Sequence, residues 1–173
     1  MKKLPKIISQ EEFEGVFQAT LRLKRSDKKR LALAMLLGFE AGMRISEILG
    51  WSNIIPKLEK SNVSDISIRI FGKGKKERIV PRPKRFNENA KEMLPLKISR
   101  RATQTFITKI GRDVLKRNIT FHTLRHGFGS HLAGQGRPLH EIQMLMGHSR
   151  LDITGIYTHS NPKTAVEGAR DVF

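Results

Sequence analysis

The chain contains no cysteine and no long apolar run, and each absence excludes a class of protein. Without cysteine there can be no disulfide, no thiolate zinc site and no cysteine nucleophile. The longest apolar stretch, residues 31–37, is far shorter than the roughly 20 residues that a membrane-spanning helix needs. The N-terminus has no apolar segment typical of a signal peptide. We therefore expect a soluble, cytoplasmic protein.

Acidic residues are also scarce relative to basic ones. Asp and Glu number 16 against 33 Lys and Arg, which gives a formal net charge of +17. Such an excess indicates a polyanionic partner, and nucleic acid is favoured because its regular phosphates release counterions when many cations bind them. An anionic membrane surface is disfavoured, since no basic helix carries aromatic residues along an apolar face. The 173 residues suit a single domain.

Tryptophan and tyrosine each occur once. Trp51 is expected to serve in packing. Tyr157, in contrast, lies close to the end of a segment rich in histidine and arginine, residues 120–159. A phenol with a pKa of about 10 attacks another group only if a proton acceptor is near and cations stabilise its target. If the chain forms a covalent bond through tyrosine, Tyr157 is the sole candidate.

Apolar periodicity and capping signals predict a mainly α-helical domain with one small antiparallel sheet. Residues 66–70 alternate as a half-buried strand does, and residues 72–75 supply the turn to a returning strand at 76–80. The predicted helices start after Ser9 and at about residues 27–42, 43–49, 99–116, 123–134, 138–147, 149–157 and 164–173.

Five segments resemble, in order, the motifs of the tyrosine recombinases, the phage-integrase family. They are Ala41–Ile48, Phe71–Pro81, His122–His126, Leu145–Ser149 and Tyr157–His159. Each motif alone has little specificity, but five in this order over about residues 5–162 are specific. The resemblance implies the α+β fold of a tyrosine-recombinase catalytic domain and a site-specific DNA strand transferase.

The resemblance also implies roles for individual residues. Tyr157 would attack the scissile phosphate and form a 3′-phosphotyrosine, while Arg44 and Arg125 would hold the non-bridging oxygens. Lys73 would protonate the leaving 5′-oxygen. Lys75 and Lys76 lie close to it, and the register of the hairpin decides which lysine faces the phosphate.

Three further residues would complete this site. His122 would assist proton transfer from the nucleophile, His148 would donate a hydrogen bond to the phosphate, and Glu47 would position the site from behind Arg44. Such enzymes need no metal and no cofactor. The spacing of His122, His126 and His131 does not keep all three on one helix face, so a metal site is disfavoured.

Further basic residues are expected to contact DNA, mostly its phosphates. These predicted contacts are Lys75, Lys76, Arg78, Arg82, Lys84, Arg85, Arg25 and Lys28. The partner is double-stranded DNA, on which a monomer would assemble into a homo-tetramer, in the nucleoid of a host cell. We expect residues 1–173 to be one catalytic domain without an N-terminal core-binding domain, either a fragment or a short enzyme. Residues 163–173 would form a tail that docks on a neighbouring protomer.

Several functions fit these motifs. An integrase of a viral or other mobile genome, of archaeal type, is favoured, and a recombinase that resolves chromosome dimers is second. A nicking-closing enzyme of the type IB topoisomerase kind would use similar chemistry without joining two duplexes. A DNA-binding module without catalysis would need no nucleophile, so the complete motif set argues against it.

Overall fold

The computed structural model describes residues 7–72, 76–147 and 162–173. Eight α-helices, a short 3-10 helix and two strands make up this part of the chain. In order they are α1 (Gln10–Arg22), α2 (Lys28–Glu40), α3 (Ile45–Leu49), η1 (Lys60–Asn62), β1 (Ser67–Phe71), β2 (Glu77–Pro81), α4 (Glu88–Glu92), α5 (Arg100–Leu115), α6 (Phe121–Gly134), α7 (Leu139–Met146) and α8 (Pro162–Asp171).

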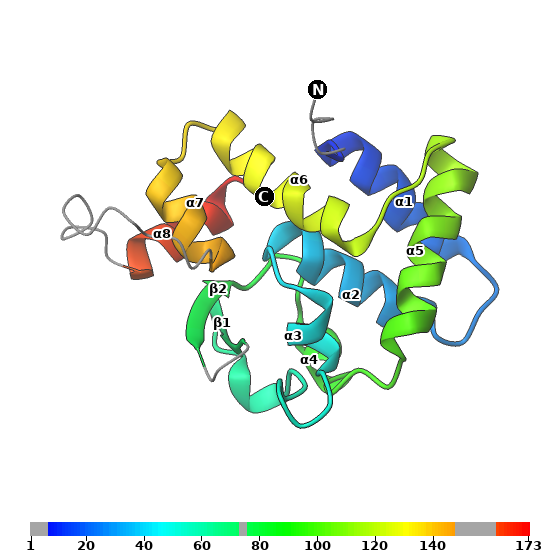
Figure 1. Ribbon diagram of the computed structural model, residues 1–173, viewed down its shortest axis with the longest axis horizontal. Helices are drawn as coiled ribbons and strands as arrows, with labels where there is room; N and C mark the ends of the chain where they lie inside the picture. The colour runs from blue at the N-terminus through cyan, green and yellow to red at the C-terminus, as the bar shows by residue number, and fades with distance from the viewer. Residues whose placement is uncertain (1–6, 73–75, 148–161) are drawn as a thin grey trace.

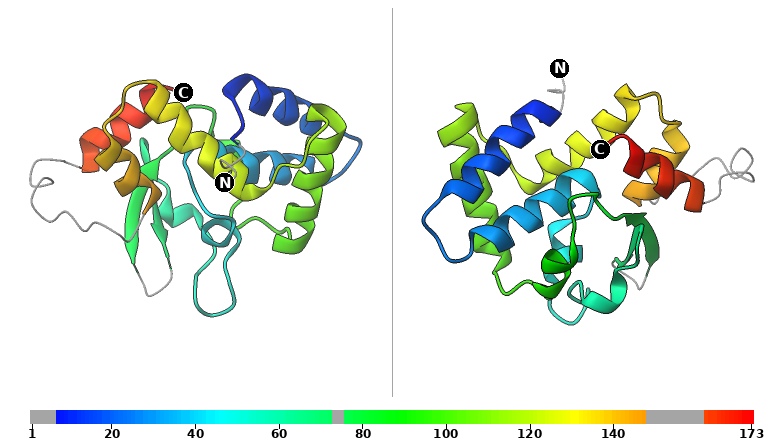
Figure 2. Two further views of the ribbon diagram at one scale, coloured as in Figure 1. Left: turned by 45° about the horizontal axis from the view of Figure 1, so that its top comes forward. Right: turned by 180° about the vertical axis from the view of Figure 1, so that it is seen from behind.

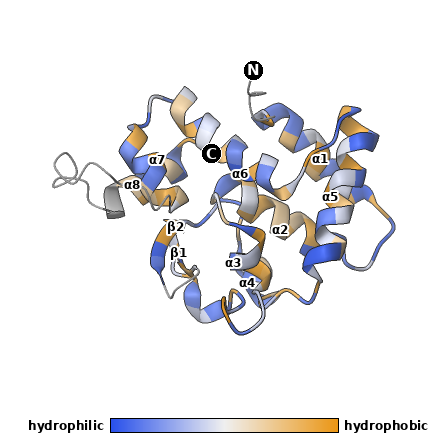
Figure 3. Cartoon of the chain, viewed as in Figure 1, coloured by the Kyte–Doolittle hydropathy of each residue, from blue (hydrophilic) through white to orange (hydrophobic). Residues whose placement is uncertain are grey.

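Helix α2 is the centre of the larger core. Every residue from Leu31 to Glu40 is buried, as expected of a helix that is apolar on most sides. It packs against α1 on one side and against α6 on the other, and α1 in turn contacts α5 (Figure 1). Figure 3 shows the same contrast, with apolar residues gathered along α2 and polar ones on the outer helices. The core therefore fixes α6 relative to the end of α2.

The two strands form the predicted antiparallel hairpin. Their register runs from Ser67 opposite Pro81 to Phe71 opposite Glu77. Ile68 and Ile70 are buried and Arg69 is exposed between them, so the alternation read from the sequence is confirmed. The hairpin thus buries Ile68, Ile70 and Val80, whereas Arg69, Glu77 and Ile79 are exposed.

Helices α7 and α8 form a smaller layer beside the hairpin. Helix α8 contacts both β2 and α7, and Figure 2 shows these elements grouped at one end of the molecule from two further directions. Their apolar side chains make a second buried cluster with the C-terminal half of α6: Phe128, Leu132, Ile142, Leu145, Met146, Val166 and Ala169. Helix α6 therefore belongs to both cores and joins them.

Most predicted boundaries agree with the structure. Ser9 caps α1 and forms the reciprocal pair of hydrogen bonds with Glu12 that defines a capping box. Helix α6 starts at Phe121, two residues before the predicted start, because Thr120 caps it. The short elements η1 and α4 were not predicted, and the helix expected at 149–157 lies outside the described residues.

One expectation about packing was wrong. Trp51 is not a core residue, since 42% of it is exposed. On α5, Thr103, Phe106 and Ile110 are buried, whereas Ala102 is exposed. Among the described residues no helix is both long and apolar enough to cross a membrane.

Candidate active site

The first turn of α6 brings two predicted catalytic residues to one side of a helix. Thr120 ends the preceding loop, and its hydroxyl accepts a hydrogen bond from the backbone N–H of Thr123 at 3.2 Å. His122 and Arg125 are three residues apart, so they are neighbours on the surface of this helix. His122 is exposed, whereas Arg125 is only 3% exposed.

Arg44 and Glu47 meet at the start of α3. The carboxylate of Glu47 accepts two hydrogen bonds from Arg44, one from its backbone N–H at 2.6 Å and one from its Nη1 at 2.9 Å. The side chain of Glu47 is fully buried, while 38% of the Arg44 side chain is exposed. Glu47 therefore lies behind Arg44, on the side away from solvent.

Arg44, His122 and Arg125 open into one cleft of about 350 Å³. The remaining wall is made by residues of α3, α5 and the start of α6: Ile45, Ser46, Gln104, Thr120 and Phe121. The structure thus brings together three of the six residues predicted to be catalytic. The other three, Lys73, His148 and Tyr157, lie outside the described residues.

The electrostatics of this cleft favour an anion. Burial, together with repulsion from Arg44 and Arg78, lowers the pKa of Arg125 to about 9, against the opposing charge of Glu47. His122 is exposed only in part, and the partial desolvation of its ring also lowers its pKa, with further contributions from His126, Arg125 and Arg44. His122 is therefore neutral at pH 7 and can accept a proton. An anion bound between the arginines would relieve their mutual repulsion.

Several predicted DNA contacts have acidic partners within the chain. Lys76 is exposed beside the hairpin turn, Lys28 is half-buried in the first turn of α2, and Lys75 lies outside the described residues. The others form ion pairs: Arg25 with Asp27, Arg78 with Glu47, Arg82 with Glu88, Lys84 with Asp171, and Arg85 with Glu14 and Glu40. A contact between any of these residues and DNA stays a prediction.

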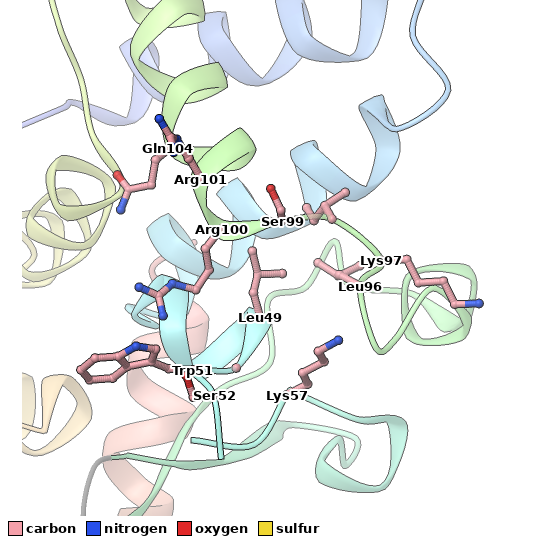
Figure 4. Close-up of a pocket in the computed structure, with 12 residues that line it drawn as sticks. Leu49, Trp51, Ser52, Lys57, Leu96, Lys97, Ser99, Arg100, Arg101 and Gln104 are labelled. Atoms are coloured by element: carbon pink, nitrogen blue, oxygen red, sulfur yellow. The ribbon is translucent and has the colours of Figure 1, made fainter. Parts of the chain in front are cut away.

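A second concave surface continues from the cleft. Gln104 on α5 lines the cleft and also a groove of about 820 Å³, in which Arg100 lies over the Trp51 ring at 5.5 Å. Figure 4 shows Lys57 and Lys97 on the side of this groove opposite Trp51. Gln104 also begins a row of polar residues along α5: Thr105, Thr108, Lys109 and Arg112.

The sequence interpretation missed this surface. The polar positions of α5 repeat every three or four residues opposite its apolar ones, so the signal was present. It was not recognised because only the apolar face of α5 was used to define the helix. Among the residues the structure describes, no three His, Asp or Glu side chains come together as metal ligands would.

Comparison with known proteins gives the family. Residues 6–164 match the model of the phage integrase family, and the chain belongs to this family. A tyrosine recombinase XerD of Staphylococcus aureus is 33% identical over 182 residues, and that of Oceanobacillus iheyensis is 30% identical over 187. Both alignments cover 91% of this chain and 59% of the relative, so the chain spans about three-fifths of their length.

Solved structures share the fold. The integrase of mycobacterium phage Brujita superposes with a TM-score of 0.72 at 23% identity, covering 100% of this chain and 60% of the integrase. The XerH site-specific recombinase, bound to its difH substrate before cleavage, gives a TM-score of 0.66 at 25% identity. That alignment covers 94% of this chain and 53% of XerH. The predicted fold class is confirmed.

Proposed function

We propose that this chain is the catalytic domain of a tyrosine site-specific recombinase, which cleaves and rejoins DNA strands through a 3′-phosphotyrosine. The observation that carries the proposal is the cleft that Arg44 and Arg125 share with His122, whose pKa is lowered. Two guanidinium groups suit the non-bridging oxygens of a phosphodiester, where charge accumulates during displacement. Membership of the phage integrase family supports the same chemistry.

The proposed reaction conserves the number of phosphoester bonds. The phenol oxygen of Tyr157 forms a bond to phosphorus, and the bond from phosphorus to the 5′-oxygen breaks. The phenol proton passes to His122, and Lys73 gives a proton to the leaving 5′-oxygen. His148 donates a hydrogen bond to the phosphate. A 5′-hydroxyl of another strand then reverses these steps, so neither a metal nor a nucleotide is required.

The proposed DNA path runs from the cleft along α5. Gln104 borders the cleft, the Trp51 groove and the polar row of α5, so a duplex with its scissile phosphate in the cleft would lie beside these residues. The groove adds a local cluster of cations: Lys57, Lys97, Arg100 and Arg101. We expect phosphate contacts here and base contacts from the exposed side chains of α5.

The biological role follows from the sites that are joined. We favour integration and excision of a mobile or viral genome, with resolution of chromosome dimers as the second candidate. The structures of relatives with DNA support a duplex as substrate, since XerH is bound to difH DNA. Assembly of a tetramer on that duplex belongs to the same proposal.

The test is covalent trapping on DNA. The protein is mixed, with EDTA and without nucleotide, with a library of nicked duplexes of random core sequence, and SDS stops the reaction. Cleavage next to the nick releases a short 5′-hydroxyl strand, so the adduct accumulates and its DNA can be sequenced. Tyr157→Phe is the matched control, because it removes only the nucleophilic oxygen.

We expect an SDS-stable adduct with the wild-type chain and none with Tyr157→Phe. An adduct that persists in Tyr157→Phe would refute the tyrosine mechanism. A supercoiled plasmid and two duplexes with the selected site then separate the alternatives. Joined duplexes indicate a recombinase, relaxation alone indicates a nicking-closing enzyme, and binding without any adduct indicates a DNA-binding module.

A further inference from the structure

Three arginines converge on the C-terminal end of α7. The last carbonyls of a helix have no partner within it, and they form the negative end of the helix dipole. Here the carbonyls of residues 145–147 each accept a hydrogen bond from one guanidinium, and the donors in that order are Arg78, Arg125 and Arg44. These arginines come from β2, α6 and the start of α3. The end of α7, next to the predicted catalytic His148, is thus held from three elements.

Arg78 differs from the other two arginines because its guanidinium binds both carboxylate oxygens of Glu47. Its Nη1 and Nη2 bind the two carboxylate oxygens of Glu47 at 2.5 and 2.9 Å, and its Nε donates to the Leu145 carbonyl at 2.8 Å. Only 13% of its side chain is exposed, and it does not line the cleft that Arg44 and Arg125 share. Arg78 therefore lies behind the residues that line the cleft and does not face its opening.

Glu47 connects Arg78 to a predicted phosphate ligand. Its buried carboxylate receives the fork of Arg78 on one side and the Nη1 and backbone N–H of Arg44 on the other. Burial acts to raise the pKa of Glu47, but the hydrogen bonds and charges of Arg78 and Arg44 outweigh it and hold the carboxylate ionised. Without Arg78, this carboxylate would lose half of its donors in a site without water access.

The chain also packs closely around Arg78. Gly147 has a φ of +60°, and a Cβ added there would lie 2.9 Å from the Arg78 Cδ. The turn that ends α7 thus lies directly on the stem of Arg78. A shift of this stem would displace both the turn and the carbonyls behind it, because nothing larger than glycine fits between them.

We propose that Arg78 is a positioning residue, which joins the hairpin, the Glu47–Arg44 pair and the end of α7 into one rigid support for the scissile phosphate. The inference rests on the proposed function and deepens it. This positioning role replaces the DNA contact expected of Arg78. Its Nη1 and Nη2 both bind Glu47, so the guanidinium cannot also form a bidentate contact with a phosphate.

The first test separates positioning from DNA attraction. Arg78→Gln is compared with Arg69→Gln, which removes the same charge from the same hairpin but affects only an exposed pair with Glu77 at 3.7 Å. Single-turnover cleavage is measured on a saturating trapped duplex, and DNA affinity is measured in the Tyr157→Phe background. We expect cleavage by Arg78→Gln to fall roughly 100-fold, as misplaced catalytic groups do, with affinity changed no more than in Arg69→Gln. Equal cleavage by the two variants, or a selective loss of affinity in Arg78→Gln, overturns the proposal.

A double-mutant cycle shows whether Arg78 acts through Glu47. Glu47→Gln, Arg78→Gln and the double variant are compared at a temperature where circular dichroism shows all three folded. We expect the double variant to lose about as much cleavage as the worse single variant, because one linked unit is broken in each. Losses that multiply mean independent roles and overturn the proposal.

Arg78→Lys separates geometry from charge. Lysine keeps the charge but cannot span both Glu47 oxygens and the Leu145 carbonyl, so we expect it to remain as slow as Arg78→Gln. Full recovery by lysine means that charge alone matters and overturns the proposal. If the wild-type chain forms no adduct at all, it is the proposed function that fails, whereas a wild-type adduct with an unaffected Arg78→Gln refutes only the role of Arg78.

Discussion

The lowered pKa of His122 favours the neutral ring that the proposed mechanism needs as its proton acceptor. A histidine at its ordinary pKa of about 6.5 would be partly charged near neutral pH. In this cleft, burial and the neighbouring cations lower the pKa of His122 below that value, and the ring of His126 lies edge-on to it at 5.0 Å. In the proposed mechanism, this shift prepares His122 to receive a proton from the phenol of Tyr157.

The pH dependence of cleavage follows from this shift. We expect single-turnover cleavage to be constant around pH 7 and to fall only below pH 6.5, as His122 becomes protonated. In the same acidic range, His122 binds a proton more readily in the unfolded chain than in the folded one. The free energy of unfolding therefore also decreases as the pH is lowered. Replacing His126 by glutamine removes the charge interaction with His126 that helps to lower the pKa of His122, so it should move the acid limb to higher pH. Rates measured from pH 5 to 8 test this, and a limb that does not move in His126→Gln contradicts it.

The identity of the general acid among the hairpin lysines is a separate prediction. A duplex with sulfur in place of the bridging 5′-oxygen leaves as a thiolate, which needs no proton because thiols are far more acidic than alcohols. We expect Lys73→Ala to cleave the oxygen substrate slowly and the sulfur substrate at a near-normal rate. Lys76→Ala, a nearby exposed lysine, is the control and should change neither rate much. If the sulfur substrate instead rescues only Lys76→Ala, then Lys76 and not Lys73 is the general acid.

Helix α6 holds His122 and Arg125 in place through close contact with its neighbours. Gly127 is the tightest point, since a Cβ there would lie 2.7 Å from Phe39 Cε2 and 2.9 Å from the Ile8 carbonyl oxygen. Gly134 is in the same helix, yet a Cβ there would meet nothing within 4 Å. The two glycines therefore form a matched pair for testing the packing of this element.

We expect opposite effects from the two substitutions. Gly127→Ala overpacks the core and should lower the free energy of unfolding by roughly 1–3 kcal/mol, and cleavage should fall as α6 moves. Gly134→Ala should be neutral or should stabilise by up to about 1 kcal/mol, because alanine favours a helix. Urea unfolding and the trapping assay measure both effects. A stable, fully active Gly127→Ala would mean that α6 tolerates displacement.

The C-terminal helix packs within its own chain, so we expect protomers to assemble only on DNA. Helix α8 packs on α7 and β2, and Phe173 stacks on Phe128 of α6 at a ring distance of 5.8 Å. The family resemblance predicts that the tail docks on a neighbouring protomer. For this to happen, the tail would first have to break these contacts within its own chain. A net charge of +17 opposes self-association of the free chain.

Light scattering tests this expectation for the whole molecule. We expect Tyr157→Phe to be monomeric alone and to form a tetramer with two duplexes that carry the selected site. Binding should weaken steeply with salt, since each phosphate contact releases counterions. A stable tetramer without DNA would contradict the prediction.

The motifs and the main elements could be predicted because their signals are local. Tyr157, His122 and Arg125 are conspicuous in the sequence, since a phenol, an imidazole and a guanidinium in close succession suit attack on a phosphate. Ser9 and Glu12 predict the start of α1, and the alternation of Ile68 and Ile70 predicts the first strand of the hairpin. These features depend on residues within a few positions of each other.

Partners across the chain could only be decided by the tertiary structure. Arg78 and Glu47 are 31 positions apart and Arg85 and Glu40 are 45 apart, so the sequence alone did not indicate that two arginines of this basic stretch pair with buried acids. The sequence by itself determined the family and the main helices. Which arginine faces the cleft and which supports it depends on where the hairpin, α3 and α7 meet, because ion pairing follows distance in space and not distance along the chain.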